Sequence, residues 1–166
     1  MASQKKYILS KEIAEKKLRR MAYEILENNI DEKMIILAGI RESGSVVAKM
    51  IQHILHEIST IQTELITISL DKKHPKEVHL SKIYDFDDRV VIVIDDVVNG
   101  GKTLLYALKP FLDFQPKKIQ TLILVERTHK SFPVRPDYVG ISIATTIQEH
   151  IFVEVEGDSV IGAYLE

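Results

Sequence analysis

Two adjacent carboxylates, Asp95 and Asp96, end a branched apolar run and are followed closely by a glycine pair in the stretch VVIVIDDVVNGGKT, residues 90–103. Carboxylates accept hydrogen bonds from hydroxyl groups, whereas backbone N–H groups at the turn before a helix bind phosphate. Together they fit a ligand that carries a phosphate and, a few ångströms away, two neighbouring hydroxyls. A ribose 5-phosphate has both. A plain strand-to-helix connection with capping aspartates and turn glycines fits the residues equally well.

The phosphate half of this stretch matches neither of the common nucleotide loops. A Walker loop requires a glycine five positions before Gly101, and that position is Asp96. No G-x-G-x-x-G dinucleotide motif is present either. We therefore expect the phosphate to be held by the turn and the start of the following helix, that is, by Val98, Asn99, Gly100, Gly101, Lys102 and Thr103.

Strands and helices alternate along the chain and would carry these residues at one edge of a sheet. Helical periodicity predicts helices over Ser10–Asn28, 45–58 and 103–114, the last with Pro110 as a kink or early end. Short apolar runs predict strands at 34–40, 64–70, 119–125, 138–143 and 151–155, with loops at 71–88 and 126–137. The opening stretch supplies a further buried strand, with Asp95 and Asp96 at its carboxyl end. This order predicts an α/β fold with a mostly parallel sheet flanked by helices on both faces. Ligands bind such sheets beyond the strand carboxyl ends, where Asp95 and Asp96 stand.

Length and composition limit the possible functions. The 166 residues, 45% hydrophobic, predict a single domain over 1–166. A net charge of −2 gives no general attraction for nucleic acids or acidic membranes, and the lack of cysteine excludes disulfides and thiolate catalysis. No run approaches the roughly 18 apolar residues of a membrane span, and the start lacks a signal peptide core. We expect a soluble cytoplasmic protein without membrane contact.

The stretch resembles the phosphoribosyl pyrophosphate (PRPP) motif of type I phosphoribosyltransferases, with Asp95, Asp96, Gly101 and Thr103 in register. Gly100 departs from it, because the family places a hydroxyl residue there. A second segment, VERTHKSFPVRPDYVG at 125–140, resembles the PyrR branch, regulators of pyrimidine operons with uracil phosphoribosyltransferase activity. The residues in register there are Glu126, Arg127, His129, Lys130, Pro133, Val134, Arg135, Asp137, Tyr138 and Gly140. With weaker matches elsewhere, the resemblance covers nearly the whole chain.

The resemblance implies a type I phosphoribosyltransferase fold with a small hood, drawn from roughly 71–84 and 126–166. It implies PRPP and Mg²⁺, with Asp95, Asp96 and Arg127 as catalytic residues and the two aspartates meeting the metal only indirectly, through PRPP and water. Pyrophosphate would be held by Arg41, Glu42, Ser43 and Gly44, although the family usually has arginine where Ser43 stands. Lys72, Lys73 and His74 are the hood cations, and Arg127, His129, Tyr138 and Val139 are the base-binding residues. Each of these sets has a plain alternative: a solvated turn, a charged loop, an ion-paired loop anchor or, for Tyr138, a core residue.

The expected reaction transfers phosphoribose from PRPP to a nucleobase, with uracil, giving UMP, as the first choice. One alternative is purine salvage, because P-D-Y-V-G also resembles hypoxanthine-guanine transferases. Another is a degenerate homologue without turnover. A third alternative is a UMP-sensing RNA-binding regulator, whose basic face would comprise Lys16, Arg19, Arg20, Lys130 and Arg135, although a solvated helix face also explains the cluster. A homodimer or homotetramer is expected from the resemblance.

Overall fold

The main sheet has six strands in the order β4-β3-β2-β5-β6-β7. The computed structural model describes residues 4–166. The strands of this sheet are β2 (Met34–Ile40), β3 (Gln62–Leu70), β4 (Val78–Leu80), β5 (Val90–Val98), β6 (Lys118–Arg127) and β7 (Tyr138–Ile143). All pair in parallel except β4, which runs antiparallel to β3 at one edge. The carboxyl ends of the five parallel strands therefore meet at the same edge of the sheet.

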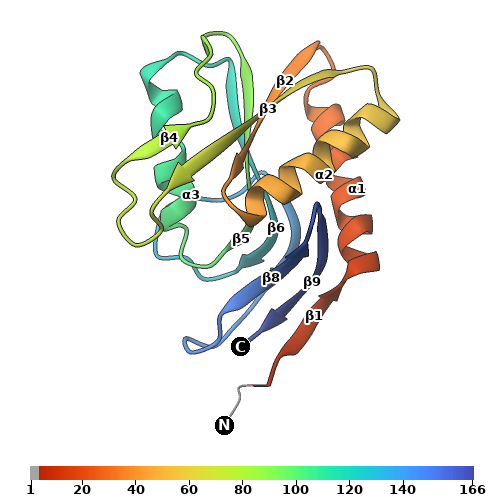
Figure 1. Cartoon of the computed structure of the whole chain (residues 1–166), viewed down its shortest axis with the longest axis vertical. Helices are drawn as coiled ribbons and strands as arrows, with labels where there is room; N and C mark the ends of the chain where they lie inside the picture. The colour runs from red at the N-terminus through yellow and green to blue at the C-terminus, as the bar shows by residue number, and fades with distance from the viewer. Residues whose placement is uncertain (1–3) are drawn as a thin grey trace.

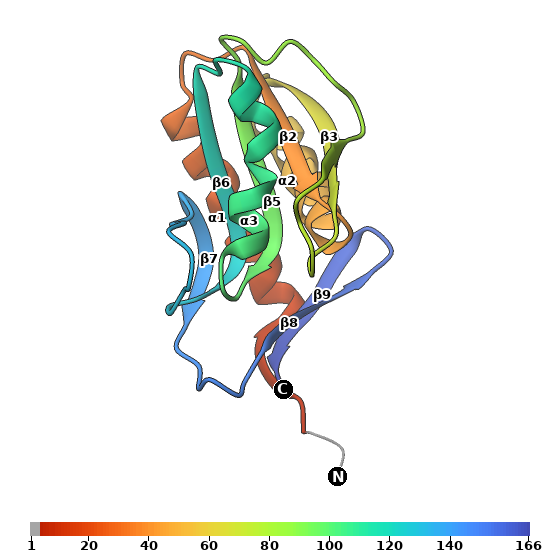
Figure 2. The ribbon, with the colours of Figure 1, turned by 90° about the vertical axis from the view of Figure 1, so that its left-hand side faces the viewer.

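Helices cover both faces of this sheet (Figures 1 and 2). Helices α1 (Lys11–Asn28) and α2 (Ser43–Ile58) pack on one face, and α3 (Lys102–Ala107) with the 3-10 helix η1 (Lys109–Asp113) lies on the other. The Ser10 hydroxyl caps α1 by accepting from the Ile13 N–H at 3.2 Å. Pro110 falls in η1, immediately after α3 ends, where its missing N–H and rigid ring disfavour a continued α-helix.

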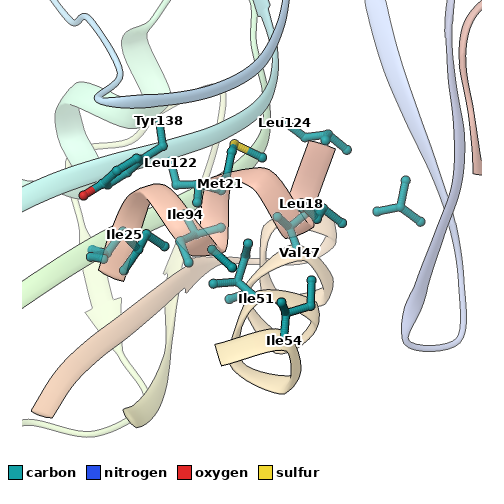
Figure 3. Close-up of a cluster of buried hydrophobic side chains, with 14 of the residues drawn as sticks. Leu18, Met21, Ile25, Val47, Ile51, Ile54, Ile94, Leu122, Leu124 and Tyr138 are labelled. Carbon is teal, nitrogen blue, oxygen red and sulfur yellow. The ribbon is translucent and has the colours of Figure 1, made fainter. Parts of the chain in front are cut away.

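Two apolar clusters hold these layers together. The larger lies between the sheet and helices α1 and α2, and Figure 3 shows Leu18, Met21 and Ile25 of α1 facing Val47 and Ile51 of α2. The smaller cluster lies under α3 and is built around Phe86 and Phe111, whose rings meet edge to face with centroids 5.0 Å apart. Because both faces of the sheet are buried, its central strands are apolar almost throughout.

A second, three-stranded antiparallel sheet has the order β1-β9-β8. Its strands are β1 (Lys6–Ser10), β8 (Ile151–Glu156) and β9 (Ser159–Leu165). Figures 1 and 2 show it beyond one end of the main sheet, and the Ile151 N–H donates to Asn99 Oδ1, just past the end of β5, at 3.4 Å. This small sheet therefore stands over the carboxyl edge of the main sheet.

The predicted α/β architecture is confirmed, and most predicted elements appear within two residues of their expected bounds. Helix α2 begins at Ser43 rather than residue 45, and the helix predicted over 103–114 ends early at Ala107. The sequence prediction missed β1 and β9, which pair with each other in the small sheet, where β9 also pairs with β8. Residues 78–80, expected in a hood, pair with β3 in the main sheet. Residues 1–3 of the predicted domain lie outside the described part of the chain. No helix within residues 4–166 has both the length and the apolar character that crossing a membrane requires.

Candidate active site

Asp95 and Asp96 lie near the carboxyl end of β5 and are almost fully buried, at 2% and 6% exposure. Successive side chains of a strand point to opposite faces of the sheet, so the two carboxylates lie in different surroundings. The Asp96 N–H donates to Asp95 Oδ1 at 2.9 Å. Asp96 Oδ1 is buried and has no hydrogen-bond partner among the residues described. A buried carboxylate oxygen without a donor is costly, and a ligand hydroxyl would satisfy it.

Asp95 faces the first turn of α2. A Cβ built on Gly44 would lie 2.8 Å from Asp95 Oδ1 and 2.9 Å from the Ile94 carbonyl oxygen, so only glycine allows this approach. Burial raises the pKa of Asp95 well above its ordinary value, and the charge of Asp96 raises it further, whereas Lys72 acts in the opposite direction. The structure thus brings the first acid, the predicted pyrophosphate loop and one predicted hood cation together.

A cleft of ≈ 840 Å³ lies between the start of α2 and the loop after β3. Arg41, Glu42 and Ser43 line one side, and Lys72 and His74 line the other. The Arg41 N–H donates to the Ile68 carbonyl at 2.9 Å, which fixes this turn to β3, and the Arg41–Glu42 peptide bond is cis. With Lys76 and His79, which also line it, the cleft carries five cationic or titratable basic groups. Lys73, also predicted for this role, is exposed but is not among the residues that line the cleft.

The predicted phosphate loop runs from Val98, the last residue of β5, to Thr103 in the first turn of α3. Gly101 has φ = 91°, a conformation that side chains disfavour, which explains a glycine at this position. The Gly100 carbonyl accepts from the N–H groups of Ser131 and Phe132 at 3.0 and 3.1 Å. This carbonyl is thus engaged with the loop after β6. Lys102 is exposed, and Thr103 is half-buried.

On the base side, the structure brings only part of the predicted set to the edge. Arg127 ends β6 and donates through Nη2 to the Glu149 carbonyl, while its Nε is buried without a partner among the described residues. His129 is exposed and lines a separate hollow of ≈ 580 Å³. Tyr138 and Val139 lie at the opposite, amino-terminal end of β7.

The prediction that the Tyr138 side chain contacts a base is not supported, because this side chain is a core residue, 2% exposed. Its hydroxyl donates to Gln120 Oε1 at 2.7 Å, and burial raises the pKa of Tyr138 to about 12. The Val139 carbonyl accepts from Arg20 at 2.9 Å. Both residues thus tie β7 to its neighbours.

The predicted basic face is largely neutralised. Lys16 pairs with Glu12 at 3.2 Å, Arg19 pairs with Glu57 at 2.7 Å, and Arg20 pairs with Glu24. Lys130 lies 2.9 Å from Glu126 and is only 14% exposed. Of the five residues, Arg135 alone is exposed and forms no ion pair with any residue between 4 and 166.

Comparison with known families identifies the arrangement. The phosphoribosyl transferase domain family matches residues 4–158, nearly the entire chain. The chain belongs to the phosphoribosyltransferase family. This phosphoribosyltransferase is therefore an enzyme of the class that the PRPP motif indicated. The two acids, the glycine turn and the cationic cleft at one edge of the sheet agree with this assignment.

Named relatives confirm the resemblance to PyrR. The phosphoribosyltransferase is 32% identical over 161 residues to a bifunctional protein PyrR of Haemophilus ducreyi, covering 91% of this chain and 90% of the relative. It is 34% identical over 144 residues to one of Streptococcus pneumoniae, covering 83% of each.

Solved structures confirm the type I fold. A hypoxanthine phosphoribosyltransferase of Trypanosoma cruzi superposes with a TM-score of 0.78 at 14% identity, covering 97% of each chain. A hypoxanthine-guanine phosphoribosyltransferase of Bacillus anthracis gives 0.69 at 21% identity, covering 83% of this chain and 82% of the other. At these sequence identities, the similarity shows only that the fold is shared.

Sequence reasoning missed Thr145, whose Oγ1 is buried without a partner in the described chain. The residue stands just beyond the carboxyl end of β7, a parallel neighbour of β6. A polar residue two positions after a parallel strand was the available signal.

Proposed function

We propose that the enzyme transfers phosphoribose from PRPP to uracil, giving UMP and pyrophosphate. The observation that carries this proposal is the pair of buried acids, one with an unpartnered oxygen, at the strand end that leads into the glycine turn. Similarity to PyrR over 83–91% of the chain favours uracil among the possible bases.

In this proposal, the ribose 5-phosphate part of PRPP lies over the end of β5. The ribose hydroxyls donate to Asp95 and Asp96, and Asp96 Oδ1 gains the donor that the described chain does not supply. The 5′-phosphate rests on the N–H groups of residues 98–103 and on the Thr103 hydroxyl. Lys102, exposed beside the turn, adds positive charge.

The pyrophosphate then lies in the cleft between the start of α2 and the loop after β3. Arg41, Lys72 and His74 stabilise its negative charge. Among residues 4–166 there is no cluster of three or more His, Asp or Glu side chains suited to a metal ion. Asp95 and Asp96 would therefore meet Mg²⁺ only indirectly, through PRPP and water, as suits an ion that keeps several waters and binds substrate phosphates. When bound, the metal would neutralise charge on the leaving pyrophosphate.

The reaction is a displacement at ribose C1. The bond from C1 to the pyrophosphate oxygen breaks, taking its electron pair, while a ring nitrogen of the base forms the new bond to C1 and loses its proton to Asp96 or to water. Positive charge develops on the sugar, so the carboxylates at the end of β5 favour the transition state. The small sheet above this edge would exclude water from the cationic sugar. No nucleophilic side chain is required.

The direct test measures pyrophosphate release from PRPP and Mg²⁺ with uracil, hypoxanthine, guanine or xanthine. Release with uracil alone supports the proposal, whereas release with a purine would move the enzyme to purine salvage. No release with any base would mean a homologue without turnover. Asp96→Asn should lower turnover by at least about 100-fold, since one transition-state contact is worth about 10²–10³. Asp113→Asn, on the exposed end of η1, is the matched control.

RNA binding is a second proposal, favoured by Arg135 and His129. Both are exposed on the loop after β6 and form no ion pair within the described chain, unlike the α1 cluster. Binding of an RNA hairpin at low salt, with a salt dependence that Arg135→Ala makes shallower by about one charge, would support it. Arg19→Ala, which breaks an ion pair on α1, is the control, and no binding at low salt would exclude this role.

A homodimer or homotetramer is also proposed, from the resemblance to PyrR. Sedimentation of the purified protein over a range of concentrations tests it, and a monomer at every concentration would contradict it.

A further inference from the structure

The cleft between the start of α2 and the loop after β3 has a balanced set of fixed charges. Its lining includes three side chains that stay cationic at neutral pH: Arg41, Lys72 and Lys76. It also includes three carboxylates: Glu42, Asp71 and Glu77. The two other titratable groups in the lining are His74 and His79. With neutral imidazoles the lining therefore has no net charge, and with both imidazoles protonated it carries two positive charges.

The strand register directs His79 into this cleft. His79 is the middle residue of β4, the edge strand of the main sheet (Figure 1), and it pairs with Ser69 of β3, which also lines the cleft. The neighbours of His79 in β4, Val78 and Leu80, instead pack against the apolar cluster under α3. Because successive side chains of a strand point to opposite faces, His79 points to the face that carries α2.

Both imidazoles are accessible to an anion in the cleft. His74 is exposed on the loop after β3 and forms no ion pair within residues 4–166. His79 Nε2 lies 3.8 Å from Glu77 Oε2, and both side chains are largely exposed, at 75% and 87%, so this contact is weak. Further charged groups belong to neighbouring segments but do not line the cleft: Asp95, Lys73 and Lys109. The histidines therefore remain available to bind a ligand.

Protonation of the histidines changes what this cleft can hold. Histidine is the side chain whose charge ordinarily changes between pH 5 and 8, a range in which arginine and lysine keep theirs. A protonated imidazole donates from both ring nitrogens, and its hydrogen bonds to phosphate oxygens are charge-assisted. Acidification therefore converts a lining without net charge into a cationic one, which favours a multiply charged anion such as pyrophosphate.

We propose that protonation of His74 and His79 controls how tightly the enzyme holds pyrophosphate. This inference rests on the proposed function, because it assumes that pyrophosphate lies in this cleft. The contribution of the histidines is fully present at pH values below their titration and is lost as the pH rises through it. PRPP carries the same pyrophosphate group, so its affinity follows the same course. Product pyrophosphate should therefore inhibit the enzyme more strongly at acidic pH.

Calorimetric titration with pyrophosphate and Mg²⁺ tests the proposal by comparing the unaltered enzyme with a His74→Gln/His79→Gln variant at about pH 6 and about pH 8. Glutamine keeps hydrogen-bonding groups but does not titrate. Because ligand and metal titrate identically in both experiments, the ratio of the two affinities isolates the histidines. The unaltered enzyme should bind roughly 5- to 25-fold more tightly near pH 6, since each exposed ion pair adds up to about fivefold, and nearly equally near pH 8.

Two controls accompany this comparison. His53→Gln changes a histidine of similar exposure, 78%, that lies on α2 outside the cleft. This variant should bind pyrophosphate as the unaltered enzyme does at both pH values. Ribose 5-phosphate has no pyrophosphate group, so its affinity should be the same for the unaltered enzyme and the double variant.

An affinity ratio that stays the same at both pH values would overturn the inference, while binding of pyrophosphate itself would leave the proposed function intact. If the double variant failed to fold, NMR titration of the imidazoles in the unaltered enzyme would decide instead. By linkage, both histidines should keep their protons to higher pH when pyrophosphate is bound, and identical titrations with and without it would overturn the inference. Absence of pyrophosphate binding at either pH would also overturn it. Failure to bind ribose 5-phosphate would count against the proposed ribose site instead.

Discussion

Replacing Gly100 with threonine should tighten PRPP binding, because the turn lacks the hydroxyl that the PRPP motif usually provides. The structure can accept the change: a Cβ built on Gly100 meets no atom within 4 Å. Its backbone also lies outside the positive-φ region that only glycine adopts easily, unlike that of Gly101 at φ = 91°. Gly100→Thr therefore adds a hydroxyl beside the proposed 5′-phosphate without a steric conflict.

The size of the gain follows from the energy of one hydrogen bond to a charged group. Such a bond is worth about 1.5–3 kcal/mol, which corresponds to roughly 10- to 100-fold in affinity. Calorimetric titration with PRPP and Mg²⁺, and separately with ribose 5-phosphate, would measure it. Both ligands should gain equally, because both carry the 5′-phosphate. An increase for neither ligand in a folded Gly100→Thr protein would refute the 5′-phosphate cradle.

The neighbouring glycine provides the matched control. Gly101→Thr places the same side chain one residue further on, but at a strained φ and with its Cβ 3.5 Å from the Phe132 carbonyl oxygen. It should weaken binding of both ligands. Gly157→Thr, at φ = 58° in the turn between β8 and β9, carries similar strain away from the site and should leave affinity unchanged.

Two further predictions concern Asp95. Gly44→Ala should lower PRPP affinity and cost about 1–3 kcal/mol in the free energy of unfolding, because the new methyl lies 2.8 Å from Asp95 Oδ1 and 2.9 Å from the Ile94 carbonyl; unchanged thermal unfolding and binding would contradict it. Asp95→Asn should raise the melting temperature at neutral and higher pH. Burial raises the pKa of Asp95, so the folded state binds more protons than the unfolded state, and the native carboxyl loses stability as pH rises from its ordinary pKa through the raised one. The gain from asparagine should shrink towards acidic pH, and a gain independent of pH would argue against a raised pKa.

Much of the fold was predictable because its signals are local. Ser10 and the apolar spacing after it predict α1, and the branched residues before Asp95 predict a strand buried on both faces. Strands β1 and β9 were missed because they are short or of mixed polarity and gain stability only by pairing across the whole chain, as Tyr7 does with Tyr164. Such non-local pairing leaves little trace in a single window of sequence.

The candidate site likewise has one part that local sequence predicts and another part that depends on non-local contacts. Asp95, Asp96 and the glycine turn are contiguous, so their common position at one strand end could be predicted from spacing alone. The approach of Gly44 to Asp95 depends on two strands meeting at one edge and could not. Tyr138 was assigned to the base from its register in a motif, yet parallel pairing places it far from the carboxyl edge, and Thr145 occupies the position beyond that strand instead.

The most direct test of the account is the stoichiometry of products from PRPP, Mg²⁺ and uracil. The account predicts that UMP and pyrophosphate appear in equal amounts, that neither forms without uracil, and that Asp96→Asn suppresses both together. Pyrophosphate released without a base, or no UMP under conditions in which ribose 5-phosphate binds, would contradict it.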